Sequence, residues 1–295
     1  MISKNRIDWL KQVLIYTMCI LFLGILIHEM GNYLWSRGNL ETLVLNSNEG
    51  DGFRKQEFST FSIEQIRKFV KTEQVELSSL LTVLLSQKKF DGRDIDLRSY
   101  TLEDYQEEMD FLKSKNDHGF EQLKQSYKAI WEDIEYFPIP VAKDTSVPFV
   151  TYEDSWMFER NYGGKRGHEG VDLMAGVEER GKYPVISMTD GVVERIGWLE
   201  KGGYRIGIRS TNGGYFYYAH LSHYSESFKE GQSIKAGQLL GFMGDSGYGP
   251  EGTMGQFPIH LHLGIYIRTE NQTEVSVNPY WILKYFEEDK LTYYY

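Results

Sequence analysis

The sequence predicts a mainly β domain, an antiparallel β-sandwich or barrel, preceded by an α-helical region and an N-terminal transmembrane helix. Three observations predict this order. An uncharged apolar run, Val13 to Ile27, lies near the N-terminus. Apolar stripes at helical spacing follow between residues 61 and 136. From Tyr183 onward the chain reads as short strands separated by turn residues.

The apolar run is short for a membrane span, which needs about 20 residues, but apolar and aromatic neighbours extend it on both sides. Its basic flank precedes it, as Lys4, Arg6 and Lys11. This charge bias places the N-terminus in the cytoplasm and the rest of the chain outside. A cleaved signal peptide is disfavoured because no small-x-small site follows, and a buried helix is disfavoured because the run is apolar all round. We therefore expect residues 1–35 to be a single-pass anchor in the cell membrane, with the rest extracytoplasmic.

A polar stalk is expected over 36–60, followed by a helical region over 61–136. A capping box at 62–65 opens the first stripe, and a break is expected near Gln74. Thr101 is expected to cap a second helix, and a third stripe runs from Phe120 to Ile134. Such stripes usually form a core. A coiled-coil role, or a protein partner bound through this region, is the alternative.

Three closely spaced prolines, Pro138, Pro140 and Pro148, place a linker at 137–150. The β domain is then expected over 151–286, with a C-terminal tail at 287–295. Short strands are predicted at 184–188, 191–196 and 204–208. Because no helical pattern separates these strands, an antiparallel arrangement is favoured over a parallel one.

Composition limits the function classes. The formal net charge is −10, which makes a nucleic-acid partner unlikely on electrostatic grounds. Cys19 is the single cysteine, so the chain can form no internal disulfide. The segment 247–252 matches Gly-x-Gly-x-x-Gly, but prolines and glycines leave no room for the helix that a dinucleotide site needs.

The segment 259–267 reads Ile-His-Leu-His-Leu-Gly-Ile-Tyr-Ile. On a strand, successive side chains point to opposite faces, so one face is aliphatic and the other carries His260 and His262. The two imidazoles then lie about 7 Å apart along the backbone. One can bind a metal while the other reaches a metal-bound water. Two surface histidines on a half-exposed strand are the alternative.

Two further motifs carry metal-ligand chemistry. His168 and Asp172 follow a glycine-rich stretch, and we expect a loop that enters a strand. His220 ends an aromatic strand that begins at Gly214, with Phe216 and Tyr218 expected on the same face as His220. Each motif alone has an ordinary structural explanation. Together they supply three ligands of the types that Zn²⁺ prefers, with two histidines left for acid–base chemistry.

These motifs resemble the lysostaphin-type, or β-lytic, zinc metallopeptidases of bacterial cell walls. The resemblance rests on His-x-x-x-Asp, Ala-His-Leu and His-x-His in that order and covers about 152–286. It implies that His168, Asp172 and His262 are the zinc ligands. It also implies that His220 and His260 are catalytic histidines that do not bind the metal. The glycine-rich region 241–255 takes the place of a groove-rim loop in the family.

The expected function is therefore a membrane-anchored zinc metalloendopeptidase, an enzyme that hydrolyses peptide bonds of peptidoglycan. The implied cofactor is Zn²⁺ and the implied partner is a peptidoglycan peptide. Two alternatives remain: an envelope scaffold that uses a peptidase-like domain for binding, and a zinc protease that acts on proteins. The complete set of five residues favours an active enzyme over a scaffold.

Overall fold

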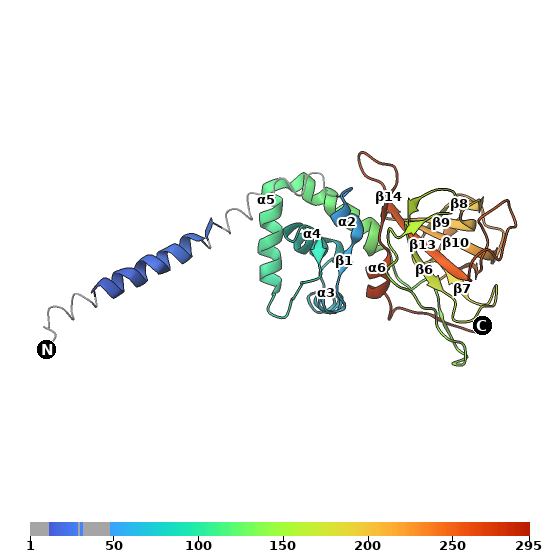
Figure 1. Cartoon of the computed structure of the whole chain (residues 1–295), viewed down its shortest axis with the longest axis horizontal. Helices are drawn as coiled ribbons and strands as arrows, with labels where there is room; N and C mark the ends of the chain where they lie inside the picture. The colour runs from blue at the N-terminus through green and yellow to red at the C-terminus, as the bar shows by residue number, and fades with distance from the viewer. Residues whose placement is uncertain (1–11, 29, 32–47) are drawn as a thin grey trace.

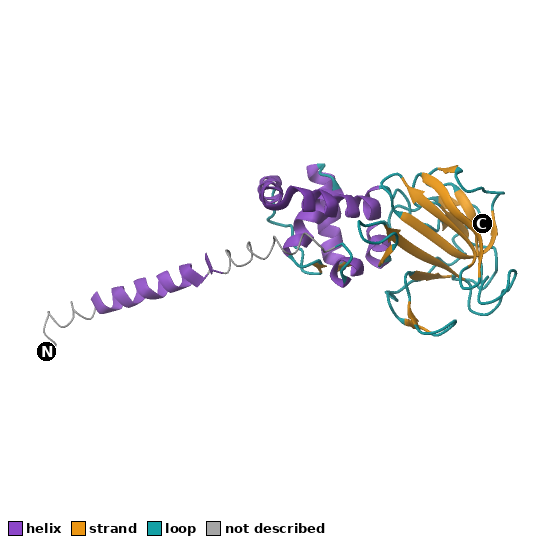
Figure 2. Cartoon of the chain, turned by 90° about the horizontal axis from the view of Figure 1, so that it is seen from above, coloured by secondary structure: helices purple, strands orange, loops and turns teal. Residues whose placement is uncertain are grey.

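The computed structural model describes residues 12–28, 30–31 and 48–295. Helices gather at the N-terminal side of the folded body and a large sheet forms the other side (Figure 1, Figure 2). The mainly β character and the preceding helices are thus confirmed.

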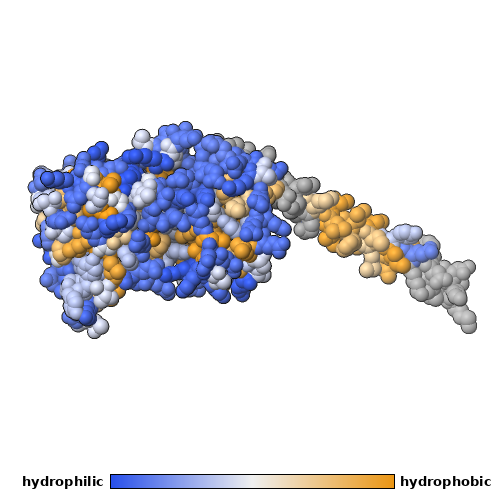
Figure 3. Space-filling model, turned by 180° about the vertical axis from the view of Figure 1, so that it is seen from behind, coloured by the Kyte–Doolittle hydropathy of each residue, from blue (hydrophilic) through white to orange (hydrophobic). Residues whose placement is uncertain are grey.

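Residues 12–28 form a helix whose side chains are exposed. Figure 3 shows this helix as an apolar segment beside a largely hydrophilic body. Within residues 12–28, 30–31 and 48–295, no helix combines the length and hydropathy that crossing a membrane requires. The other residues of the expected anchor, 1–11, 29 and 32–35, lie outside the described residues, as does 36–47 of the expected stalk.

The helical part contains α2 (Asp51–Lys55), α3 (Thr60–Glu73), α4 (Leu77–Gln87), α5 (Leu102–Tyr127) and the π-helical turn η1 (Lys128–Glu132). Strands β1 (Glu57–Phe58) and β2 (Asp91–Gly92) pair beside them in parallel.

Helix ends follow local side-chain chemistry. The α3 cap is Ser59, whose hydroxyl accepts from the Ser62 N–H, so the helix begins before the capping box predicted at 62–65. The break at Gln74 is confirmed, with a left-handed φ of 53°. Thr101 caps α5, as predicted. Non-helical angles at Asn116 kink α5 and separate the two stripes expected as separate helices.

The β part is built on a nine-stranded sheet in which every pairing is antiparallel, as expected. One path runs β11-β8-β9-β10-β12-β7, and β13 pairs with β10, β14 and β6. The strands are β6 (Val171–Met174), β7 (Pro184–Ile186), β8 (Gly191–Leu199), β9 (Gly203–Ser210), β10 (Tyr215–Tyr224), β11 (Ser233–Ile234), β12 (Leu239–Met243), β13 (His260–Ile267) and β14 (Val275–Val277). Smaller elements are β3 (Val141–Ala142), β4 (Glu159–Arg160), β5 (Arg166–Gly167), α6 (Tyr280–Tyr285) and β15 (Thr292–Tyr293).

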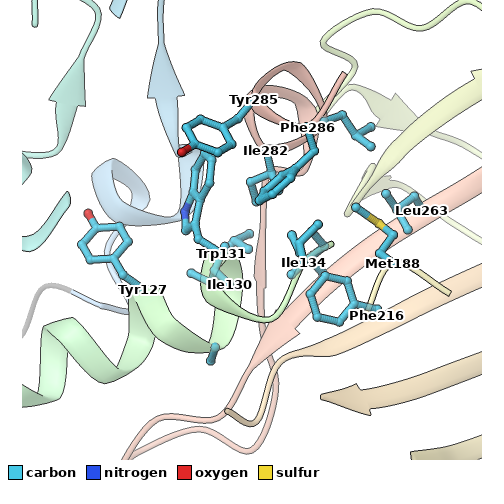
Figure 4. Close-up of a cluster of buried hydrophobic side chains, with 14 of the residues drawn as sticks. Tyr127, Ile130, Trp131, Ile134, Met188, Phe216, Leu263, Ile282, Tyr285 and Phe286 are labelled. Atoms are coloured by element: carbon cyan, nitrogen blue, oxygen red, sulfur yellow. The ribbon is translucent and has the colours of Figure 1, made fainter. Parts of the chain in front are cut away.

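One hydrophobic core joins the helices to the sheet. Figure 4 shows Trp131 and Ile134, which follow α5, packed beside Tyr285 of α6 and near Phe216 of the sheet. The Trp131 indole N–H donates to Gln56 Oε1 at 2.8 Å, and its ring meets Tyr285 edge-on at 5.7 Å. The two parts therefore share their packing.

The segment expected to be a linker, 137–150, is packed into the β part. Phe137 and Ile139 are fully buried. The Val141 N–H donates to the Leu291 carbonyl at 2.8 Å, and β3 pairs with β15 in the segment expected to be a tail. The prolines mark an irregular backbone, because they lack a donor, and Pro138 and Pro140 are buried whereas Pro148 is exposed. The domain boundaries themselves stay a prediction.

Candidate metal centre and active site

Strand register brings two of the motifs together. On β13, His260 and His262 share one face, whereas Leu261, Leu263 and Ile265 are fully buried on the other. The alternation predicted for this strand is confirmed. The antiparallel pairing of β13 with β6 places His262 directly opposite Asp172. A histidine and a carboxylate 90 residues apart therefore become neighbours.

His168 completes a triangle of donor atoms. It lies in the short connection between β5 and β6. This connection is the loop that the sequence predicts before a strand. Its Nε2 is 3.1 Å from Asp172 Oδ1 and 3.0 Å from His262 Nδ1. The third side, His262 Nδ1 to Asp172 Oδ1, is 3.0 Å. The three residues expected to be ligands thus converge on one point.

The donor set fits zinc. Tetrahedral Zn²⁺ with bonds of about 2.0–2.2 Å separates its ligand atoms by roughly 3.3 Å, close to the triangle found here. Two imidazole nitrogens and one carboxylate oxygen are ordinary zinc ligands, and three protein ligands leave a fourth position for water or substrate.

Supporting groups orient these donors. His168 Nδ1 lies 3.1 Å from the Ser155 carbonyl oxygen and 3.1 Å from Arg160 Nη2, and these contacts on Nδ1 turn Nε2 toward the triangle. Arg160 Nη2 lies 2.5 Å from Asp172 Oδ2, which leaves Oδ1 for the triangle. Sequence reasoning missed Ser155 and Arg160, because nothing in their spacing marks them.

Electrostatics keep Asp172 ionised. Burial opposes ionisation, but hydrogen bonds to His168 and His262 outweigh it and hold the pKa of the Asp172 carboxyl well below its usual range. Burial also lowers the pKa of His262, although Asp172 opposes that shift. A carboxylate beside neutral imidazoles is the protonation state that binds a metal.

Gly170 leaves the space that the His262 ring occupies. A Cβ on Gly170 would lie 2.5 Å from His262 Cε1 and 2.5 Å from the Leu263 carbonyl oxygen. Real Cβ atoms essentially never come this close. The glycine between His168 and Asp172 therefore has a packing reason.

His220 reaches the site through a β-bulge. The register of β10 against β9 shifts between Tyr218 and Leu221, and His220 has a left-handed φ of 63°. The extra residue changes the alternation, so His220 joins the groove-lining face of Tyr217 rather than the buried face of Phe216 and Tyr218. The face predicted for His220 was wrong for this reason, and the strand continues beyond it to Tyr224.

The two histidines outside the triangle are held in one tautomer. His220 Nδ1 donates to the Ser246 carbonyl at 2.8 Å, and His260 Nδ1 donates to the Pro258 carbonyl at 2.7 Å. In a neutral ring that donates through Nδ1, Nε2 is the nitrogen left to accept a proton. The rings lie 4.8 Å apart between centroids, and His260 Nε2 is 3.7 Å from Asp172 Oδ1. Burial lowers the pKa of His220 well below its usual value, with further repulsion from His260, so His220 is neutral and able to accept a proton.

The five residues lie in a groove of 680 Å³. Tyr248, from the glycine-rich region expected at the groove rim, and Phe257 line it and pack around His220. Tyr248 also stacks on Tyr162 with centroids 4.2 Å apart, which joins two loops beside the groove. His223 lies on the exposed end of β10 against Phe242, away from the site.

Fold and site together define the metallopeptidase class of protein, and comparison with known proteins gives the family. Residues 166–279 match the sequence profile of Peptidase family M23. A crystal structure from Ruminococcus gnavus, of a protein that carries the name of the glycyl-glycine endopeptidase LytM, is 43% identical with a TM-score of 0.75. That match covers 88% of this chain and 98% of the other. The chain belongs to peptidase family M23, and the resemblance predicted from its motifs is confirmed.

Two curated relatives match shorter parts of the chain. The L-Ala–D-Glu endopeptidase of Bacillus subtilis is 42% identical over 168 residues, which are 57% of this chain and 48% of that protein. Lysostaphin of Staphylococcus simulans is 32% identical over 118 residues, 35% of this chain and 23% of that one. The chain thus matches about half or less of the length of these curated relatives.

Proposed function

We propose that this chain is a zinc metalloendopeptidase that hydrolyses peptide bonds of peptidoglycan. The observation that carries the proposal is the triangle of donor atoms at 3.0–3.1 Å beside two histidines whose Nδ1 atoms donate to backbone carbonyls. The name of the L-Ala–D-Glu endopeptidase supplies the substrate class, since a bond between an L- and a D-amino acid is a feature of peptidoglycan peptides. A complete set of hydrolytic groups in one groove supports an enzyme over a scaffold.

In this proposal, His168 Nε2, Asp172 Oδ1 and His262 Nδ1 hold the zinc. When bound, the ion supplies Lewis acidity toward the scissile carbonyl and toward an attacking water. His220 and His260 then do the proton chemistry: one Nε2 accepts the proton of the water, and an imidazolium N–H stabilises negative charge on the carbonyl oxygen. The Ser246 and Pro258 carbonyls keep both rings aimed through their Nδ1 protons.

The test is digestion of purified peptidoglycan by the zinc-loaded full-length protein, with new termini identified by mass spectrometry. New amino and carboxyl termini within stem or bridge peptides are expected, and a chelator should abolish them. Intact peptidoglycan after exhaustive digestion, with zinc bound, would refute the substrate class. Cleavage of protein substrates alone would support the protein-directed protease instead.

We further propose that residues 1–35 anchor the chain in the cell membrane with the N-terminus in the cytoplasm. The apolar run and the exposure of its side chains in the 12–28 helix support this. Full-length protein should remain in the membrane fraction after carbonate and high-salt washes. A soluble mature form that begins shortly after Ile27 would contradict it.

A further inference from the structure

Cationic side chains without a protein partner line the groove beside the metal ligands. Arg166, on β5, and Arg205, on β9, both line it. Within the described part of the chain, neither guanidinium has a hydrogen bond or an ion pair, and Arg166 Nε and Arg205 Nη1 are buried. Other arginines that line or border the groove are occupied: Arg160 pairs with Asp172, Arg195 with Glu230 and Arg209 with Glu194.

Both arginines are half-buried, and the inaccessible nitrogen of each is costly to leave unpaired, because its N–H loses water without gaining an acceptor. The chain as a whole is acidic, so carboxylates are abundant, yet none of the described ones satisfies these two arginines. A ligand that brings its own carboxylate into the groove would satisfy them, and the planar fork of arginine matches a carboxylate in geometry.

The sheet fixes where this carboxylate would lie. Ala219 of β10 is opposite His262 of β13, while Tyr217, two residues earlier, is opposite Gly207 of β9. Arg205 is therefore about two strand spacings from His262, roughly 10 Å between backbones. Because the arginine side chain reaches back toward His262, the distance from its guanidinium to the donor triangle is about the length of one or two residues of an extended peptide.

Two tyrosine side chains cover glycine backbone in the part of the groove between His262 and Arg205. A Cβ on Gly207 would lie 2.0 Å from the Tyr215 hydroxyl, and one on Gly202 would lie 2.2 Å from the Tyr217 hydroxyl. The tyrosine rings thus lie across glycine backbone, between the ligand His262 and Arg205. Besides Asp172, two acidic residues line the groove: Glu169, which lies 3.8 Å from Arg54, and Glu274, which forms no ion pair with Arg166 or Arg205 among the described residues.

We propose that Arg166 and Arg205 form a carboxylate subsite that selects an acidic residue within one or two positions of the scissile bond. This rests on the proposed function and narrows it. The preferred substrate is then an acidic stem peptide with a free carboxylate, rather than an uncharged polyglycine bridge.

The test uses two synthetic peptides that contain an L-Ala–D-Glu bond, the bond for which the Bacillus subtilis relative is named, and that differ only in one group beside it: a free carboxylate or the corresponding amide. Binding is measured with metal-free full-length protein, and cleavage with the zinc-loaded protein. Wild type should favour the carboxylate about 10- to 100-fold in Kd and in kcat/KM, as expected for a charged hydrogen-bonded pair. Arg205→Gln and Arg166→Gln should each move that ratio toward one, and Arg205→Lys should give an intermediate ratio.

Arg195→Gln is the matched control, because it removes the same charge from an exposed, ion-paired arginine in the groove. It should keep the ratio. Equal affinity of wild type for both peptides would overturn the subsite, as would an equal loss in Arg195→Gln and Arg205→Gln. Cleavage of both peptides without preference would leave the proposed function standing and the subsite refuted. Selective binding of the carboxylate peptide without any hydrolysis would support the subsite and refute the proposed function.

Discussion

His262 meets two requirements at once. Its Nδ1 belongs to the donor triangle, and its ring fills the space that Gly170 leaves open. Ser155 and Arg160 impose similar constraints on His168 and Asp172 from outside the triangle. Groups that only orient ligands commonly change metal affinity by about 10- to 100-fold when removed. The candidate metal centre therefore extends beyond its three donor residues.

His262→Ala should greatly weaken zinc binding, because it removes one of three protein ligands. His220→Ala and His260→Ala should retain zinc and lose activity by about 100-fold or more, as for a lost acid–base group. Elemental analysis and hydrolysis assays on the same preparations check both statements. Full zinc content in His262→Ala would remove that residue from the ligand set.

Gly170→Ala should lower zinc affinity without removing any ligand, since a methyl group would push the His262 ring out of the triangle. Competition with a chelator measures the affinity. Gly164→Ala is a poor comparison because its φ is positive, so Gly24→Ala, where a Cβ meets nothing within 4 Å, serves as the control. An unchanged zinc affinity in Gly170→Ala would contradict this account of the glycine.

Stability of the metal-free protein should fall as pH drops below about 6.5. Burial lowers the pKa of His220 and of His262 in the folded state, so the unfolded chain binds protons first as pH falls. The stabilisation is complete above the unfolded pKa of about 6.5 and is lost on acidification. Denaturant titrations between pH 8 and 5 measure it. His220→Gln should show a smaller decrease, and an identical decrease would exclude His220 as a source.

At the scale of elements, β13 and β10 show what a sequence pattern predicts well and what it misses. The alternation of β13 was predicted correctly because its pairing with β6 and β10 is regular. The face of His220 was predicted wrongly because β10 contains a β-bulge, and the pattern of polar and apolar residues does not reveal a bulge. The motifs thus predicted five residues that the structure brings into one groove, and their assigned roles stay a prediction; their supporting groups and their faces depended on strand pairing.

Helix caps belong to this scale too. Thr101→Ala should destabilise the protein by about 0.5–2 kcal/mol, because the Thr101 hydroxyl accepts from the Asp104 N–H at the start of α5. Hydrolysis at 25 °C should be unaffected, since this cap is remote from the groove. Thr101→Ser, which keeps the hydroxyl, should lose less. Equal losses of stability in the two variants would show that the cap is not the cause.

At the scale of the whole molecule, the helices and the sheet share a core. Gly214 shows how closely they approach, since a Cβ there would lie 1.9 Å from the Ala129 carbonyl oxygen. The linker expected at 137–150 was inferred from prolines alone, and sequence spacing could not show that Phe137 and Ile139 are buried. A fragment that begins near Ser146 would leave these contacts behind.

Trp131→Ala should cost about 3–5 kcal/mol, because it opens a cavity and removes the partner of Gln56. Helical and β signals should then unfold in one shifted transition. Circular dichroism and tyrosine fluorescence in denaturant measure the two signals. Phe61→Ala, at a site 43% exposed, is the control and should change stability little. Separate transitions would show two independent units.

The bulge in β10 also bears on how members of such a family lose activity. A chain that kept all five motif residues but lost one residue of the bulge would restore regular alternation along this strand. The histidine at the place of His220 would then point into the core, and the groove would lose one of its two proposed acid–base histidines. Every motif search would still count such a chain as intact. The number of residues between Tyr218 and Leu221 should therefore matter for activity as much as the identity of the motif residues.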